Sequence, residues 1–331
     1  MTFLALAAAL LLEQARALSP THPVYTQFHR FLLFIERRLD AGSYRQGILA
    51  WALATAPIVL IVAAIALWLH RTVPLLGLLF DIGVLYLTMG FRAFSRSYRE
   101  THDALRAGDL VQARASIGRW RGGPTEELSA NEVARLAIER GLACAHRHVF
   151  GVIAWFAVFG AAGAVFYRLA ALVRDRWGAR SDTELDRFGR FSREVFHWCD
   201  WIPARLTAIA FAVTGDFEDA LYCWRTQANA WPDRSEGIVL AAGAGAIGVR
   251  LGSVVGTPAP LAGRPAPLAE RPAPLEGRPA PLEVRPELGT GEEADAELMT
   301  SAVGLIWRAL VLWLVVIALV TVASWFGSAG G

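Results

Sequence analysis

The sequence predicts an all-α fold, a polytopic transmembrane helical bundle that carries a cytoplasmic helical segment and a Pro-rich linker. Hydrophobic residues make up 54% of the 331 residues and charged residues only 19%, and the apolar residues stand in long blocks. A helix that crosses a bilayer needs about 20 consecutive apolar residues and satisfies its backbone hydrogen bonds internally. Many aromatic residues lie near the ends of the blocks, as interfacial anchors do. We therefore expect a multi-pass protein of a bacterial inner (cytoplasmic) membrane, with the lipid bilayer as its main partner.

The charged residues and the cysteines exclude several classes of function. The chain has no lysine, so all 32 basic residues are arginine. This rules out a Schiff base with a pyridoxal cofactor and a phosphate-binding loop that ends in Gly-Lys. The net charge of +2 gives no field that would attract nucleic acid. Cys144, Cys199 and Cys223 share no C-x-x-C spacing, so we predict neither disulfides nor a zinc site.

Residues 1–92 form the predicted N-terminal membrane part. Its first apolar block, Thr2 to Leu12, lacks a positive leader, so we expect a retained short helix and not a signal peptide. Thr26 to Arg45 is amphipathic and rich in arginine, which favours a helix on the membrane surface. The apolar side of this surface helix is predicted to consist of Phe28, Phe31, Leu32, Phe34 and Ile35.

A transmembrane hairpin follows the surface helix. Ile48–Leu69 and Val73–Phe91 are each long enough to span, and the short turn between them forces them to run antiparallel. Asp81 lies inside the second of these helices, where a carboxylate is costly unless it is paired or hydrated. Two interpretations stay open: a functional intramembrane acid, or a neutral acid that forms a hydrogen bond across helices.

Residues 93–148 are the predicted cytoplasmic helical segment. They are rich in arginine, and the positive-inside rule places such a segment in the cytoplasm. We expect helices over Ser95–Ala107 and Leu110–Ile117, and a third helix that begins near Ser129. Ser129 and Glu132 have the spacing of a capping box, which marks a helix start.

Residues 149–256 form a second membrane part whose path stays open at this stage. Val149–Val173 either crosses once or enters and returns as two half-helices, because glycines interrupt it and arginine-rich segments flank both ends. Ile202–Val213 is too short to span without tilt. Ile238–Leu251 is rich in Gly and Ala, a composition that permits close helix packing. Its G-A-G-A-I-G pattern also allows a phosphate cradle with Arg250, but no strand precedes it, so we favour packing.

Residues 257–300 are a predicted linker, and residues 301–331 a C-terminal transmembrane helix. The heptapeptide P-A-P-L-x-x-R occurs four times between Pro258 and Arg285. Proline at this density prevents a helix and favours an extended, semi-rigid chain. Val303–Phe326 is apolar throughout and long enough to span.

The sequence predicts no metal site and no set of catalytic residues. His146 and His148 are two positions apart and would point to different sides of a helix. His146 lies nearer to Glu139 and Arg135 on one face, and a solvated amphipathic helix is the better interpretation of that face.

Several short motifs occur in an order that is found in a known family. They are Glu13 with His22-Pro23-Val24; Leu105–Leu110 followed by Ala113-Arg114 and Gly118-Arg119; Ile202–Leu206; and Ala244–Gly252. Together they resemble the CobD/CbiB superfamily of cobalamin biosynthesis, whose relatives include AmpE, a membrane protein linked to β-lactamase induction. The resemblance covers most of the chain outside the repeats.

The resemblance implies an adenosylcobinamide-phosphate synthase, which joins an aminopropanol phosphate to a corrinoid carboxylate at the expense of ATP and uses acidic side chains to bind Mg²⁺. This sequence departs from the family where those acids belong. The family's G-R-D-T reads Gly118–Arg121, its E-N-x-x-D-G reads His146–Gly151, its Y-R-x-x-N-T-x-D reads Tyr167–Arg174, and its D-D ahead of I-P-A-R-L reads Phe196-His197. The loop that reads S-P-N-A-G in the family is present with other residues, as Asp233–Gly237.

Two functional hypotheses follow. The first is an AmpE-like protein of envelope sensing or signalling, either non-catalytic or of altered activity and with no cofactor assigned, because Asp200-Trp201 ahead of Ile202-Pro203 is similar to AmpE's D-W-[VI]-P. Its anionic ligand would be a phosphorylated metabolite, a muropeptide or a corrinoid. The retained residues that would bind this ligand are Arg119, Arg168, Asp200, Arg205 and Arg250.

The alternatives concern both the arginines and the activity. The arginines could instead pair with Asp81, Glu139 and Asp200 and so lock the bundle. The second functional hypothesis is the synthase itself, which would bind Mg²⁺ and ATP through other acids. The candidates for that role are Asp216, Glu218, Asp219, Asp233 and Glu236.

Overall fold

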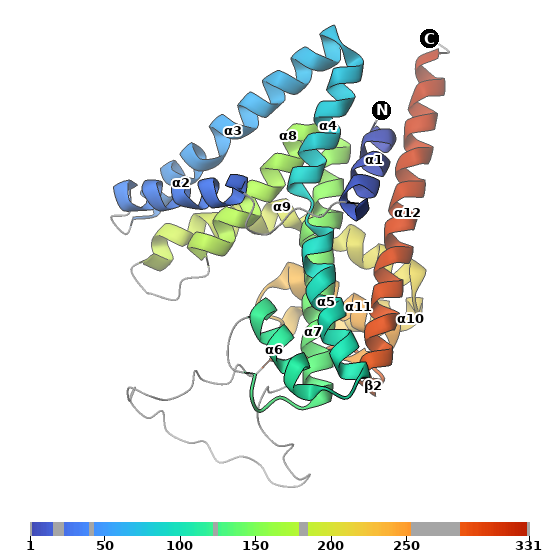
Figure 1. The fold of residues 1–331 in the computed structure, drawn as a ribbon. Coiled ribbons are helices and arrows are strands. Elements are labelled where there is room, and N and C mark those ends of the chain that lie inside the picture. The colour runs from blue at the N-terminus through green and yellow to red at the C-terminus, as the bar shows by residue number, and fades with distance from the viewer. Residues whose placement is uncertain are drawn as a thin grey trace.

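The computed structural model describes residues 2–15, 23–39, 43–121, 125–178, 185–252 and 285–329, and these are almost entirely helical (Figure 1). The predicted all-α class is confirmed. The α-helices are α1 (Thr2–Ala15), α2 (Pro23–Leu39), α3 (Tyr44–Thr72), α4 (Pro74–Thr88), α5 (Phe91–Arg106), α6 (Leu110–Arg121), α7 (Ala130–Ala145), α8 (Gly151–Val173), α9 (Leu185–Thr214), α10 (Phe217–Gln227), α11 (Arg234–Ile247) and α12 (Ala296–Ala329). Short π-helical turns η1 (His146–Phe150) and η2 (Arg174–Gly178), a 3-10 turn η3 (Ala228–Ala230) and the strands β1 (Val249–Arg250) and β2 (Glu292–Glu293) complete the elements.

Three helical stretches in the described part of the chain are long and apolar enough to cross a membrane: Tyr44–Thr72, Ala130–Gly178 and Ala296–Ala323. The predicted spans from Ile48 and Val303 coincide with the first and third. The predicted span from Val73 is shorter than expected, since α4 has 15 residues and ends at Thr88. The reason is that Met89 adopts an extended backbone conformation, after which α5 begins at Phe91.

The second stretch is not one straight helix, because it reverses at Gly160. This residue has φ 61° and ψ −150°, which is outside the helical region. A straight helix would place residues 146 and 167 about 31 Å apart. Instead the side chains of both bond to the same oxygen of Asp200. Of the two paths that the sequence left open for Val149–Val173, the structure therefore has the one that enters and returns.

The tight turn of this hairpin depends on a second glycine. A Cβ on Gly163 would lie 2.2 Å from the carbonyl oxygen of Trp155, so only glycine lets the two arms approach this closely. The ring of Trp155 packs on Phe166 of the returning arm, with centroids 5.0 Å apart. Each arm of α8 has only about half of the apolar block, and the outgoing arm continues α7 and η1 without a break.

The hairpin of α3 and α4 carries the buried acid Asp81. Its Oδ2 is 3.0 Å from Nε2 of His70, across the two helices. Among the two interpretations offered by the sequence, this geometry is that of a hydrogen bond between helices. The pair lies near the end of the hairpin, since His70 is in the last turn of α3.

The amphipathic helix α2 differs from its prediction in how it divides its apolar residues. Phe28, Leu32 and Ile35 are buried, whereas Phe31 and Phe34 are exposed. The buried three pack with α3, the end of α8 and Trp177 in a small core of their own. The predicted apolar side is thus divided: its buried part faces the fold, and its exposed part consists of Phe31 and Phe34.

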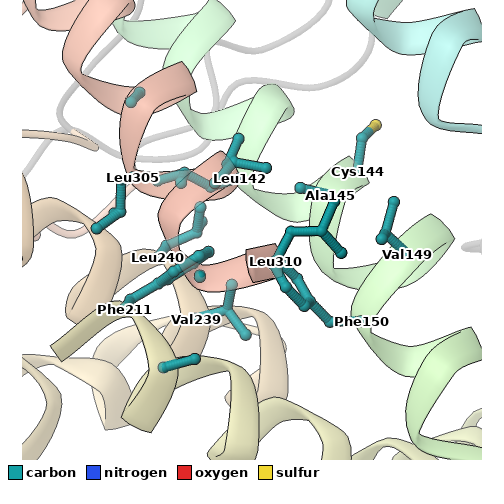
Figure 2. Packing of buried hydrophobic residues seen from close by; sticks show 14 of the residues in the cluster. Leu142, Cys144, Ala145, Val149, Phe150, Phe211, Val239, Leu240, Leu305 and Leu310 are labelled. Atoms are coloured by element: carbon teal, nitrogen blue, oxygen red, sulfur yellow. The ribbon is translucent and has the colours of Figure 1, made fainter. Parts of the chain in front are cut away.

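Helices α5, α6 and α7 gather at the end of the molecule opposite the α3–α4 turn, beside the lower part of α12 (Figure 1). The predicted capping box at the start of α7 is confirmed, with Ser129 and Glu132 exchanging both hydrogen bonds. The main core lies where α7, α8, α9, α11 and α12 meet, and Figure 2 shows Leu142, Phe150, Phe211, Leu240 and Leu310 within it. The packed rings of Phe150 and Phe211 meet edge to face.

The repeat region leaves and rejoins the fold at one place. Leu251 and Leu288 form an antiparallel bridge, and β1 pairs with β2. Glu139 accepts a hydrogen bond from Gly252 N–H at 2.8 Å and forms an ion pair with Arg285 at 3.0 Å. One carboxylate therefore binds the residues on both sides of the repeat region. The repeats themselves, apart from Arg285, lie outside the described residues.

Candidate polar site at the base of the α8 hairpin

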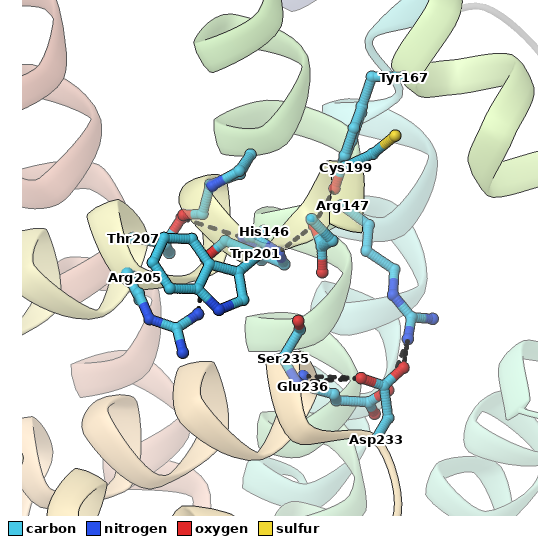
Figure 3. Close-up of polar contacts among 12 residues, drawn as sticks. His146, Arg147, Tyr167, Cys199, Trp201, Arg205, Thr207, Asp233, Ser235 and Glu236 are labelled. Carbon is cyan, nitrogen blue, oxygen red and sulfur yellow. Dashed lines mark hydrogen bonds and ion pairs between the residues drawn. The ribbon is translucent and has the colours of Figure 1, made fainter. Parts of the chain in front are cut away.

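A buried polar cluster lies where the two arms of α8 meet α9 (Figure 3). Oδ1 of Asp200 is 2.9 Å from Nε2 of His146 and accepts the hydroxyl of Tyr167 at 2.6 Å. Nδ1 of His146 is 3.0 Å from the hydroxyl of Thr207. The side chains of His146 and Asp200 are only 2% and 3% exposed, so these bonds replace water completely.

The hydrogen bonds of this cluster suit a charged pair. When the hydroxyl of Thr207 donates to the carbonyl of Pro203, Nδ1 of His146 is the donor in its contact with Thr207. With an ionised Asp200 accepting from Nε2, this arrangement of donors pairs a protonated His146 with a carboxylate. Burial would raise the pKa of Asp200, but the charge and hydrogen bond of His146 and the hydroxyl of Tyr167 outweigh it and hold this pKa below its ordinary value.

The local backbone explains why these side chains converge. At η1 the helix widens to a π-turn, in which Gly151 N–H bonds to the carbonyl of His146, and such turns re-aim side chains. Pro203 interrupts α9 and has no N–H for the carbonyl of Cys199. Nε1 of Trp155 donates to that carbonyl at 3.0 Å and so ties the hairpin to α9.

A second layer of charges lies beside the cluster, at the start of α11. Nη2 of Arg147 donates to Glu236 at 2.6 Å, and Nη2 of Arg174 donates to Asp233 at 2.6 Å. Asp233 also caps α11, because its Oδ1 accepts the N–H groups of residues 235 and 236. These four side chains are 15% to 26% exposed, so solvent and solutes reach them, unlike the pair beneath.

The two layers differ in what they can do chemically. His146 and Asp200 form hydrogen bonds with each other, with Tyr167 of α8 and with Thr207 of α9. These contacts give the two residues a structural role. Arg147 and Arg174 can exchange their carboxylate partners for a phosphate or a carboxylate of a ligand, the anions that arginine binds in fork geometry. The acids Asp233 and Glu236, once released, can bind an amine.

The described residues contain no group of three His, Cys, Asp or Glu side chains that could hold a metal ion. The acids of the second layer are occupied by arginines and do not form a carboxylate set for Mg²⁺. A magnesium ion that arrived with phosphate groups would bring most of its ligands with it, and the protein would contribute little to its coordination sphere.

The arginines predicted to bind a ligand do not converge. Arg119 forms an exposed ion pair with Glu100, and Arg250 is exposed on β1. Arg168 lies over the ring of Tyr25, and Arg205 over the ring of Trp201. Among the predicted binding residues, only Asp200 belongs to the cluster.

The alternative that the arginines lock the bundle receives no support from their partners. Asp81 pairs with His70, Glu139 with Arg285 and Asp200 with His146. The prediction that His146, Glu139 and Arg135 lie on one solvated helix face is also wrong. His146 and Glu139 are buried, and Glu139 holds the ends of the repeat region instead.

The glycine-rich stretch of α11 packs and does not cradle a ligand. A Cβ on Gly243 would meet the side chain of Leu142, and one on Gly245 would lie 2.4 Å from the carbonyl oxygen of Asp219. Gly248 ends the helix with φ 67°, a left-handed conformation that favours glycine. This is the packing role that the composition favoured.

Sequence reasoning missed the residues at the centre of the site: His146, Arg147, Tyr167, Arg174 and Thr207. Four of them lie in residues 146–151 and 167–174. These two stretches stand at the positions of family motifs from which this sequence departs. Asp233 and Glu236 were considered as substitute acids, and both are in the second layer. Residues 146–151, 167–174, 200–203 and 233–237 all include charged residues. This shared feature is the pattern in the sequence that could have indicated the site.

Comparisons with known proteins agree with the resemblance. The family model described as CobD/Cbib protein matches residues 2–256. A cobalamin biosynthesis protein CobD of Stutzerimonas stutzeri is 34% identical over 313 residues, 93% of each chain. The chain belongs to the CobD/CbiB family. Proteins of the same name from Chromobacterium violaceum and Leptospira interrogans are 38% and 29% identical, over 62% and 54% of this chain and 64% and 58% of theirs.

No solved structure matches this CobD/CbiB chain significantly. The named relatives are cobalamin biosynthesis proteins, and nothing in these comparisons supports the AmpE-like aspect of the first hypothesis. Together with the long apolar helices, family membership makes this a membrane-type protein.

Proposed function

We propose that this protein acts in cobalamin biosynthesis as the amide-forming synthase, the second of the two hypotheses drawn from the sequence. The proposal places it in the bacterial inner membrane as a multi-pass protein. The observation that carries it is the pairing of Arg147 and Arg174 with Glu236 and Asp233 at one accessible place. The names of its relatives favour this function over envelope signalling.

The charges of the second layer suit the two substrates that the reaction joins. The corrinoid contributes a carboxylate and the aminopropanol phosphate contributes a phosphate, both of which arginine can bind. The aminopropanol phosphate also contributes an amine, which an acid can bind. We infer that Arg147 and Arg174 bind the anionic groups and that Glu236 and Asp233 position the amine.

In the proposed reaction the amine nitrogen forms a bond to the carboxyl carbon, and one carboxyl oxygen leaves on the phosphate released from ATP. An ammonium group must give up a proton before its nitrogen can attack. Glu236, which is 25% exposed, is the group that we assign to accept this proton. His146 and Asp200 support the layer from beneath without contact with substrate.

The test is complementation of a synthase-deficient strain grown on cobyric acid. Growth restored by the wild-type gene, and lost with Arg147→Gln or Arg174→Gln, is the expected result. Arg225→Gln, an exposed position on α10 away from the second layer, is the matched control and should still restore growth. No growth with a wild-type protein that is shown to insert in the membrane would contradict the proposal and favour the signalling hypothesis.

A further inference from the structure

The outward face of α9 is an unbroken apolar stripe. Residues spaced three or four apart lie on one face of a helix. Along α9 such a series is exposed, from Trp198 (72% exposed) to Val213 (56%), while Asp200, Ala204 and Thr207 on the opposite side are buried. The exposed series consists of Trp198, Ile202, Leu206, Ile209 and Val213, with Trp201 beside it.

One arginine lies along this stripe and is held in place. The guanidinium of Arg205 stacks on the ring of Trp201, 3.8 Å from its centroid, and Nη1 donates to the carbonyl of Trp201 at 2.8 Å. Figure 3 shows the guanidinium of Arg205 stacked against the ring of Trp201. Water would solvate such a cation, but in lipid it is costly to leave without an anion.

A second cation is near the first. Burial and the positive charge of Arg234, the first residue of α11, lower the pKa of Arg205. In the part of the chain that the structure describes, no ion pair joins either arginine to a carboxylate. Two neighbouring positive charges that form no ion pair favour an occupant that carries negative charge.

The position of the stripe in the fold identifies that occupant. Helix α9 runs across the bundle and contacts α3 and α12, two helices that are long and apolar enough to span (Figure 1). Val315 and Leu319 of α12 are exposed as well, so a span that contacts α9 also presents apolar side chains outward. At a comparable level α2 repeats the arrangement, with the guanidinium of Arg38 over the exposed ring of Phe34.

We propose that the outward face of α9 lies in the interfacial layer of the bilayer, and that Arg205 and Arg234, beside Trp201, bind the phosphate of an anionic phospholipid. Tryptophan and arginine favour this layer, because each has an apolar body and a polar or charged end. A soluble anion would leave the apolar stripe without a function. A second copy of the chain, docked through the same face, would bring four arginines together without countercharge. The proposal does not depend on the synthase reaction.

The experiment measures the thermal unfolding midpoint of the full-length protein in a neutral detergent as phosphatidylglycerol, phosphatidylcholine or inorganic phosphate is added. Phosphatidylglycerol should stabilise the wild type more than phosphatidylcholine, and inorganic phosphate should not. In R205Q/R234Q the apparent affinity for phosphatidylglycerol should fall about 30-fold, as expected for two arginines that each contribute about 1 kcal/mol near an anionic surface.

The control is R99Q/R106Q, which removes the same charge from exposed positions on α5. It should keep the wild-type response to phosphatidylglycerol. If the double α9–α11 variant does not accumulate, R205Q and R234Q singly carry the same test, each with a loss of about fivefold. Equal stabilisation by inorganic phosphate, an unchanged response in R205Q/R234Q, or an equal loss in the control would each overturn the proposal.

Discussion

The ring of Tyr167 lies directly against the backbone of Gly151, so that a Cβ added to Gly151 would be 2.3 Å from Cζ of Tyr167. The contact joins the outgoing arm of the α8 hairpin to the returning arm. It places the phenol where its hydroxyl reaches Asp200 of α9. The buried cluster therefore depends on the absence of a side chain at position 151.

Gly151→Ala should lower the free energy of unfolding by about 1 to 3 kcal/mol, the usual cost of forcing extra atoms into a packed core. The measurement is the thermal midpoint of the purified protein in detergent. Gly83→Ala in α4 is the matched control, because a Cβ there meets nothing within 4 Å. That variant should be neutral or slightly stabilised, since alanine is the better helix former. Equal midpoints for the two variants would contradict the close contact.

Removal of the carboxylate of Asp200 should be more damaging than removal of one of its donors. Asp200→Asn leaves the buried imidazolium of His146 without its counterion, at a cost of about 3 to 5 kcal/mol. Tyr167→Phe removes one hydrogen bond to a charged group and should cost about 2 kcal/mol. Asp103→Asn, which breaks the exposed His102–Asp103 pair, should have no measurable effect. A reversed order of the first two variants would contradict the assigned charges.

Low pH should weaken the ion pair between His146 and Asp200. Because the pKa of Asp200 is lower in the folded protein than its ordinary value, its contribution to stability is fully present above the unfolded pKa of about 3.9. It is lost as the pH falls from there through the folded pKa. The difference in unfolding midpoint between wild type and Asp200→Asn should therefore shrink as the pH falls below about 4. A difference that does not shrink in this range would be inconsistent with this linkage.

The thiol of Cys199 should resist alkylation. Burial and the adjacent charge of Asp200 raise the pKa of Cys199 to about 12, and the thiolate is the reactive form. In a C144A/C223A background, iodoacetamide should modify Cys199 about 1,000-fold more slowly at pH 8 than the same residue in the unfolded chain. Intact-mass spectra over time give both rates. A rate within tenfold of the unfolded chain would show an accessible, ordinary thiol.

The sequence predicted those features of the fold that depend on local patterns, but not the site. Apolar blocks predicted α3 and α12, and the Ser129–Glu132 spacing predicted the start of α7. The convergence of His146 with Asp200 could not be predicted in this way, because these residues are 54 positions apart and meet only when the chain reverses at Gly160. Helical periodicity shows which side of a helix is apolar but does not show where the chain reverses direction. A glycine at which the chain reverses and a glycine that allows close packing cannot be distinguished in the sequence.

The ion pair between Arg147 and Glu236 should show strong energetic coupling, because both side chains are largely buried and the contact is 2.6 Å. In a double-mutant cycle of Arg147→Gln and Glu236→Gln, measured by thermal unfolding, we expect a coupling energy of about 1 to 3 kcal/mol. The exposed pair Arg190–Glu194 within α9 is the control, with an expected coupling of about 0.3 to 0.5 kcal/mol for an i,i+4 pair. The coupling at Arg147 should fall when phosphate or a corrinoid carboxylate is added at saturating concentration, because a ligand that binds the guanidinium displaces Glu236 from it. A coupling no larger than that of the control pair would mean that the two side chains are solvated separately, and the second layer would then lose its role in substrate binding.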